Sequence, residues 1–351
     1  VRTVVWEVGC STVASYPIYI NKKYRMGGRS MKEISAKQFT FVCFMVGILA
    51  AIAVLYGSIG GQAVRGENTR KFGATYMTMN NPYFQQMNAQ IQESVEANGD
   101  ILIYRDPAQD QEKQNEQILD MLEEGITGLF LNPVNWETVR PALVACKKAD
   151  VPVFVIDTNV YDDKYVAFSI LSDNYDAGVQ CAEDMMRKRS RARVVVIDSP
   201  GTKSIDDRVK GFMDTIDGDA SYEVVAMLHG KGELEVSMDV MQGLLETGQE
   251  FDVVLGGNDP TALGALAALQ MDQKQDGILI YGIDGSPDGK VMIKEGYMEG
   301  SSAQQPLVIA NEAVSMAYDY LDGKDVEELV IVPVTMITGN NIDEFDLAGW
   351  Q

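Results

Sequence analysis

Residues 72–105 of this chain decide its fold class, and they read FGATYMTMNNPYFQQMNAQIQESVEANGDILIYR. The apolar run at 72–78 predicts a β-strand, the stretch at 82–98 predicts an amphipathic helix, and the run at 101–105 predicts a second strand. A helix between two apolar strands indicates parallel pairing, because parallel strands need a long crossover connection that is usually an α-helix.

The same alternation of strand and helix continues to residue 321. Further apolar runs predict strands at 128–132, 151–157, 192–198, 222–228, 251–257 and 278–284. Helical stretches are expected near 111–124, 136–148, 204–216, 234–245, 260–270 and 310–321. Strands that are apolar throughout are buried on both faces, so the sequence predicts an α/β fold in which helices cover both faces of parallel sheets.

Length and composition limit the functions open to the chain. Its 351 residues suffice for two domains at roughly 100–200 residues each. A net charge of −22 argues against nucleic-acid binding, which needs a basic face. The four cysteines form no CxxC pair and His229 is the single histidine, which argues against a Cys/His zinc site.

The sequence carries no enzyme signature. It contains no GxxxxGK(S/T) phosphate loop, no GxGxxG after the first strand and no GxSxG nucleophile elbow. A Ser-His-Asp triad would have to use His229, which has no nucleophile motif nearby. We therefore expect a non-enzymatic protein with no metal site and no cofactor.

An uncharged apolar run, FTFVCFMVGILAAIAVLY, occupies residues 39–56. Lys32 and Lys37 precede it, and a small-residue stretch that ends at Ala63 follows it. This pattern predicts a signal peptide over 31–63 with cleavage after Ala63. The protein is therefore expected to be exported, either to the periplasm or to the outer face of the cytoplasmic membrane.

The length of the apolar run leaves an alternative open. It approaches the ~20 residues that span a bilayer, so an uncleaved anchor with membrane contact only through residues 39–59 would also fit. Residues 1–30 show no sustained period, and we expect them to be over-translated leader ahead of a true start at Met31.

Polar residues recur where the predicted strands end. Those at or just past a strand's carboxyl end are Asp157, Asp198, Asn258 and Asp284. Ligands of open parallel sheets bind at this edge. Asp and Asn are also preferred helix N-caps, so each of these residues has a structural alternative.

An ordered set of motifs connects these elements. It consists of Asn80-Asn81-Pro82-Tyr83-Phe84, Leu131-Asn132-Pro133, Pro152-Val153 leading to Asp157, Ser172-Asp173-Asn174, Arg208-Val209-Lys210-Gly211-Phe212, Gly257-Asn258-Asp259, Gly282-Ile283-Asp284-Gly285 and Ala303-Gln304-Gln305-Pro306. In this order, from about Lys71 to Val334, the chain resembles the type I periplasmic sugar-binding proteins of the ribose/galactose-binding type, which share their core with LacI-type repressors. Such proteins are substrate-binding components of ABC transporters.

The resemblance implies two Rossmann-like lobes with parallel sheets, joined by three crossings. The implied boundaries are 64–171 plus 305–333 for the first lobe and 172–304 plus 334–351 for the second. A monomer is expected. Such a protein would capture a monosaccharide or related polyol between its lobes, close over it and deliver it to an ABC sugar permease.

Two other functions can be weighed against transport. A membrane-anchored sugar-sensing domain would present its bound ligand to a chemoreceptor or a histidine kinase, and retention of the apolar run would favour it. A DNA-binding repressor would need a helix-turn-helix ahead of the first strand, where this chain has that apolar run instead.

The resemblance also assigns the binding site. The implied ligand contacts are Asn81, Tyr83, Phe84, Asp157, Thr158, Arg208, Asn258, Asp284 and Gln304. Their amide, carboxylate and guanidinium groups would bond the hydroxyls, and the aromatic rings would cover the apolar faces of the sugar. One of the two aromatic residues is expected to pack in the core instead.

Three positions depart from the ribose-binding pattern. Thr158 replaces an arginine, the stretch at Gly230–Glu233 lacks an aromatic residue, and Met77 replaces a small polar residue. The pocket should therefore be roomier and less basic on one side than a ribose site. This argues against ribose itself and leaves hexoses, deoxysugars, cyclitols and modified sugars open.

Overall fold

The computed structural model describes residues 69–351. The leader, signal-peptide and anchor predictions lie outside these residues. Within the described part, no helix combines the length and the apolar character that a membrane crossing requires. The described residues belong to one compact unit, which holds its own cores.

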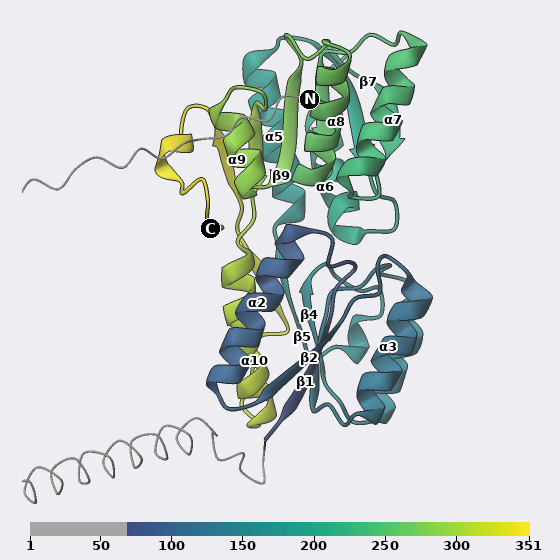
Figure 1. The fold of residues 1–351 in the computed structure, drawn as a ribbon, viewed down its shortest axis with the longest axis vertical. Helices are drawn as coiled ribbons and strands as arrows, with labels where there is room; N and C mark the ends of the chain where they lie inside the picture. Colours follow the sequence, from purple (N-terminus) through teal and green to yellow (C-terminus); the bar gives the residue numbers. More distant parts are fainter. Residues whose placement is uncertain (1–68) are drawn as a thin grey trace, which may run out of the picture. The chain divides into compact units, whose positions relative to one another are not determined.

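Lobe 1 is built on a parallel six-stranded sheet (Figure 1). Its strand order is β11 (Leu329–Val332), β5 (Phe168–Ser172), β4 (Val153–Asp157), β3 (Gly128–Leu131), β1 (Lys71–Thr75) and β2 (Ile101–Arg105). The helices of this lobe are α2 (Pro82–Ala97), α3 (Gln111–Glu123), α4 (Arg140–Lys148) and α10 (Pro306–Leu321). Helices α2 and α10 pack together on one face of the sheet, and α3 and α4 pack on the other.

Lobe 2 repeats this plan with one antiparallel edge strand. Its strand order is β12 (Thr335–Thr338), β10 (Gly300–Ala303), β9 (Leu279–Asp284), β8 (Val253–Gly256), β6 (Ala192–Asp198) and β7 (Tyr222–His229), with only the β10–β12 pair antiparallel among the described strands. Its helices are α5 (Asn174–Lys188), α6 (Lys203–Ile216), α7 (Leu234–Thr247), α8 (Asp259–Met271) and α9 (Pro287–Lys294). Two short 3-10 helices, Asp163–Tyr165 in lobe 1 and Ile342–Glu344 in lobe 2, complete the described elements.

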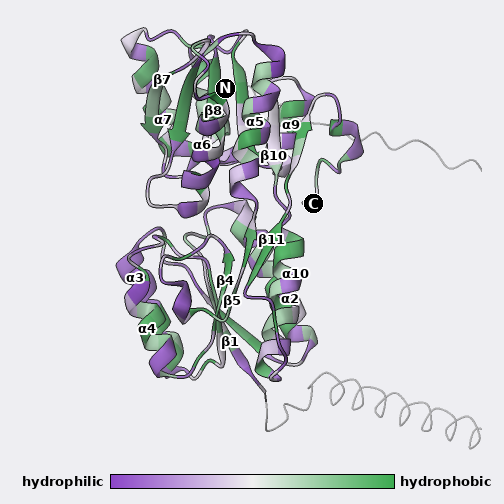
Figure 2. Cartoon of the chain, turned by 180° about the vertical axis from the view of Figure 1, so that it is seen from behind, coloured by the Kyte–Doolittle hydropathy of each residue, from purple (hydrophilic) through white to green (hydrophobic). Residues whose placement is uncertain are grey.

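The chain passes between the two sheets three times. It leaves lobe 1 after β5, returns after β10 and leaves again between β11 and β12. The predicted fold class, α/β with two lobes and parallel sheets, is therefore confirmed. Each lobe holds apolar strands in its interior and helices that carry both apolar and polar residues (Figure 2).

Several elements begin or end at residues other than the predicted ones. The first strand stops at Thr75 rather than at 78, because loop atoms take over the hydrogen bonds of Met77: its N–H donates to Asn132 Oδ1 and its carbonyl accepts from Gln109 N. Helix α4 starts at Arg140 rather than at 136, because Asn135 Oδ1 accepts from the N–H groups of Glu137 and Thr138 and holds a turn there.

Two glycines let α5 and α6 pack with their backbones in contact. A Cβ atom at Gly178 would lie 1.8 Å from the carbonyl oxygen of Arg208, and one at Gly211 would lie 2.0 Å from that of Tyr175. Both neighbours are backbone atoms, so neither can move aside cheaply. The glycines therefore set how closely α6, which carries Arg208, approaches α5.

Gly178→Ala should lower the free energy of unfolding by about 2–3 kcal/mol, because the added methyl group overpacks this contact. Gly243→Ala in α7 is the matched control, since nothing lies within 4 Å of a Cβ atom there. That variant should be neutral or more stable by about 0.5–1 kcal/mol, the usual gain of alanine over glycine in a helix. Urea unfolding of residues 64–351 checks both values, and equal losses would contradict the packing argument.

Candidate functional site

The carboxyl ends of strands from both sheets face one cavity between the lobes. We call this cavity, with a volume of about 30 Å³, the inner chamber. The predicted site residues that line it are Asn81, Tyr83, Phe84, Asp157, Arg208, Asn258, Asp284 and Gln304. Lobe 1 and lobe 2 both contribute to its wall.

Thr158 alone among the predicted site residues does not line the inner chamber. It is buried behind Asp157, where its hydroxyl donates to Asp157 Oδ2 and forms a 2.9 Å hydrogen bond with Ser204 Oγ of lobe 2. The structure thus places Thr158 as a support for the aspartate and as a contact between the lobes.

Asp157 and Asp284 each present one unpaired oxygen. Asp157 ends β4, and its Oδ2 accepts from Asn132 Nδ2 at 2.9 Å. Asp284 ends β9, and its Oδ1 accepts from Gln304 Nε2 at 2.6 Å. The other oxygen of each carboxyl, Asp157 Oδ1 and Asp284 Oδ2, is buried and has no hydrogen-bond partner.

Both aspartates have a raised pKa and an unusual backbone conformation. Burial raises the pKa of Asp157, and it raises the pKa of Asp284 well above its usual range, while the guanidinium of Arg208 opposes both shifts. Their φ angles are 66° and 147°, a region that costs free energy for residues other than glycine. Such strain persists only where the surrounding fold holds the residue in place, and it clusters at functional sites.

Arg208 is held rigidly beside these carboxylates. Its Nε donates to Asn174 Oδ1 at 2.8 Å, its Nη1 donates to the carbonyl of Gly257 at 2.9 Å, and Nη1 lies 3.7 Å from Asp284 Oδ1. The side chain is almost fully buried. A buried guanidinium in this setting offers its remaining N–H groups to acceptors in the chamber.

Asn81 and Asn258 both act as helix caps, which for Asn258 is the alternative that the sequence left open. Asn81 Oδ1 accepts from Tyr83 N at the start of α2, and Asn258 Oδ1 accepts from Thr261 N at the start of α8. Asn258 Nδ2 also donates to the carbonyl of Gly232 at 3.0 Å. Capping occupies only the oxygen of Asn81, so its amino group can still donate into the chamber.

Tyr83 and Phe84 are both buried against the lobe 1 core, whereas only one of them was expected there. They meet edge to face, with ring centroids 5.4 Å apart. Tyr83 also contacts Trp350 of the C-terminal tail, at 5.7 Å between centroids. Sequence reasoning missed Trp350, because it lies beyond the alternating strands and helices and matches none of the motifs.

Hydrogen bonds between the two lobes lie beside the inner chamber, which Gln109 and Lys231 line. Gln109 Nε2 of lobe 1 donates to Glu233 Oε1 at 2.7 Å and to the carbonyl of Lys231 at 3.2 Å, both in lobe 2. Together with the Thr158–Ser204 bond, these contacts hold the lobes in a closed arrangement. Within residues 69–351, no group of three His, Cys, Asp or Glu side chains is arranged to hold a metal ion.

Comparisons with known proteins agree with this architecture. A family model described as a periplasmic binding protein domain matches residues 72–325. The chain is 29% identical to the ribose import binding protein of Bacillus subtilis over 275 residues, which cover 77% of this chain and 88% of that protein. It is 23% identical to the xylitol-binding protein of Mycolicibacterium smegmatis over 286 residues, which cover 81% of each.

Solved structures show the same fold. An ABC transporter solute binding protein from Bacillus halodurans with bound myo-inositol aligns with a TM-score of 0.74 at 22% identity, over 80% of this chain and 98% of that one. The family match covers most of the chain, and the predicted resemblance to type I sugar-binding members is confirmed. The chain therefore belongs to the periplasmic binding protein domain family.

Proposed function

We propose that the protein is a non-enzymatic, extracytoplasmic solute-binding protein that captures an uncharged sugar or polyol between its lobes and delivers it to an ABC permease. The observation that carries this proposal is the pair of buried, unpaired acceptors, Asp157 Oδ1 and Asp284 Oδ2. A buried acceptor without a partner costs about 1–3 kcal/mol, and a hydroxyl donor from a ligand would remove that cost.

The placement of these groups accounts for capture by closure. Asp157 belongs to lobe 1, whereas Asp284 and Arg208 belong to lobe 2. A ligand that bonds all three bridges the lobes and favours the closed state by its differential affinity. Tyr83 and Phe84 add aromatic surface for the apolar C–H faces of the ligand.

The similar proteins support a hydroxyl-rich cargo without identifying it. Their names refer to ribose import and to xylitol binding, and one solved neighbour carries myo-inositol. Among the residues that line the inner chamber, the cationic ones are Arg208 and Lys231. The residue after Asp157 is a threonine, whereas ribose binders carry an arginine at this position. We therefore favour a neutral polyol other than ribose.

A thermal-shift screen of residues 64–351 against pentoses, hexoses, deoxysugars, alditols and cyclitols tests the proposal. A ligand at a hundred times its dissociation constant should stabilise the protein by about 2.7 kcal/mol. The bound compound should be recovered unchanged in mass after incubation, as expected of a carrier. If no member of the panel shifts the unfolding midpoint, the proposal fails.

A further inference from the structure

A second cavity adjoins the inner chamber, and we call it the outer chamber. Its volume is about 260 Å³, against about 30 Å³ for the inner chamber. Four residues line both cavities: Thr78, Asn81, Gly232 and Asp284. The inner chamber of this closed state holds roughly two water molecules, so a bound sugar ring must either widen it or extend into the outer chamber.

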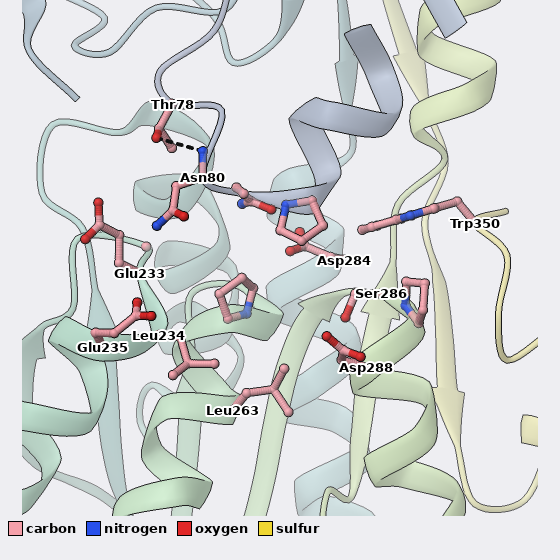
Figure 3. Close-up of a pocket in the computed structure, with 15 residues that line it drawn as sticks. Thr78, Asn80, Glu233, Leu234, Glu235, Leu263, Asp284, Ser286, Asp288 and Trp350 are labelled. Carbon is pink, nitrogen blue, oxygen red and sulfur yellow. Dashed lines mark hydrogen bonds between the residues drawn. The ribbon is translucent and has the colours of Figure 1, made fainter. Parts of the chain in front are cut away.

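Apolar side chains line part of the outer chamber (Figure 3). Trp350 lies at one end, and Leu234 and Leu263 lie on the lobe 2 side, while Pro82 and Asn80 come from lobe 1. An indole ring beside aliphatic side chains is suited to the C–H faces of a carbohydrate ring, which stack on aromatic surfaces.

The charged residues of the outer chamber all have one sign. Glu233, Glu235 and Asp288 line it together with Asp284, and the described lining includes no lysine, arginine or histidine. Carboxylates accept hydrogen bonds from hydroxyls and repel anions. The chamber is therefore suited to a neutral hydroxylated group and unsuited to a phosphate or a uronic acid.

Trp350 is fixed in place although it is the penultimate residue. The buried ammonium group of Lys290 donates to the carbonyls of Asp346 and Gly349, both at 2.6 Å. Gln351 Nε2 lies within hydrogen-bond distance of the carbonyls of Asp284, at 3.1 Å, and Gln304, at 3.0 Å. Trp350 thus stands between two anchored points of the tail and against Tyr83 of the inner chamber.

We propose that the outer chamber is a second subsite, which holds an uncharged sugar ring joined by a glycosidic bond to the ring in the inner chamber. Trp350 stacks on this second ring, and the carboxylates accept from its hydroxyls. The inference rests on the proposed function and extends its cargo from single sugars to glycosides of two units.

Isothermal titration of residues 64–351 with matched sugars tests the subsite. The probes are D-galactose against lactose, melibiose and galactobiose, D-glucose against cellobiose and maltose, and D-xylose against xylobiose. For the sugar that binds, at least one neutral disaccharide should bind about tenfold or more tightly than the monosaccharide, the equivalent of about 1.4 kcal/mol. Digalacturonate should bind more weakly than galactobiose, because its carboxylates would meet those of the chamber.

Trp350→Ala separates the two subsites. It should weaken disaccharide binding by about threefold to tenfold, the range expected for one aromatic contact, and change monosaccharide binding by less than about twofold. Leu347→Ala is the matched control, because Leu347 belongs to the same tail but packs against the lobe 2 core and does not line the outer chamber. It should leave both affinities unchanged.

A spectroscopic readout excludes a purely structural role for the indole ring. Within residues 64–351, Trp136→Phe leaves Trp350 as the single tryptophan. Closure over either ligand brings the indole against Tyr83, so its emission should shift clearly further with the disaccharide, which also places a ring on the indole, than with the monosaccharide. If monosaccharides bind and no disaccharide binds more tightly, the second subsite is refuted and the proposed function stands. If neither class binds, both fail.

Discussion

Arg208→Ala should abolish ligand capture, weakening the affinity for any sugar that binds the parent protein by about a thousandfold. Arg208 is the one cation of the described residues that forms an ion pair with Asp284. Its remaining N–H groups are charged donors to the ligand, and a hydrogen bond to a charged group contributes about 1.5–3 kcal/mol, so losing two of them accounts for the expected loss of affinity. The substitution also leaves the charge of Asp284 buried and uncompensated, a cost that falls on the fold itself. Isothermal titration of residues 64–351 measures the loss directly.

The same substitution should destabilise the ligand-free protein in a pH-dependent way. Burial already raises the pKa of Asp284, and Arg208 opposes that rise, so the pKa should climb further without the guanidinium. The uncompensated charge exists only above this pKa. The drop in unfolding midpoint should therefore be larger at pH 8 than at pH 5, because protonation removes the charge as the pH falls.

Arg193→Ala provides the comparison for a surface arginine of the same lobe. Arg193 pairs with Asp252 at 3.1 Å and Glu250 at 2.6 Å, but its side chain is 39% exposed. Exposed pairs contribute less than about 1 kcal/mol, so this variant should keep both its stability and its affinity. An Arg208→Ala protein that binds within about tenfold of the parent would contradict the assigned site.

The sequence predicted those elements whose burial leaves a strong pattern. Strand β4, whose residues are all buried, is apolar up to its last residue, Asp157, and was predicted. Strand β10 is equally buried but consists of Gly-Ser-Ser-Ala, and Ser301 is accommodated there because its hydroxyl donates to Asp259 Oδ1 at 2.7 Å. A strand of small polar residues gives no hydrophobic signal, so periodicity could not locate the second crossing that follows β10.

The residues of the candidate site also fall into two groups, those that a sequence pattern predicts and those that it does not. Asp157 and Asp284 could be proposed from the sequence, because strand ends of parallel sheets meet at one edge. Gln109 and Ser204 could not, because their contacts exist only when the lobes close, and closure depends on the hinge rather than on a local pattern. Trp350 reaches the site through the tail that Lys290 anchors, a tertiary contact without a sequence motif.

Asp284→Asn should weaken ligand binding by about ten- to a hundredfold while making the ligand-free protein more stable at neutral pH. The substituted asparagine could still accept from Gln304 Nε2 through its remaining oxygen, the bond that Asp284 makes at 2.6 Å. Its amino group would replace Oδ2, so a ligand hydroxyl would meet a donor instead of a charged acceptor. Hydrogen bonds to charged groups contribute about 1.5–3 kcal/mol, which sets the expected loss.

The gain in stability follows from the direction of the pKa shift. Burial raises the pKa of Asp284 well above its value in the unfolded chain, so the protonated form stabilises the fold at low pH and this contribution disappears as the pH rises through the raised pKa. Asparagine is neutral at every pH and avoids that loss. The variant's advantage in unfolding midpoint should therefore be greatest near pH 8 and vanish below the pKa of the unfolded carboxyl.

Asp252→Asn is the control with the opposite sign. Its hydrogen bonds with Arg193 lower the pKa of Asp252, so its charged form stabilises the fold and that contribution is lost as the pH falls through the lowered pKa. Asp252→Asn should thus be neutral or slightly destabilising at pH 7, with unchanged affinity.

In Asp284→Asn the charge of Arg208 still has a partner. Two carboxylates share its guanidinium in the inner chamber, so removing that of Asp284 leaves a neutral pair of Arg208 with Asp157. A pH-independent difference for Asp284→Asn would show that Asp284 is not held as a strained, buried charge that a hydroxyl donor would relieve.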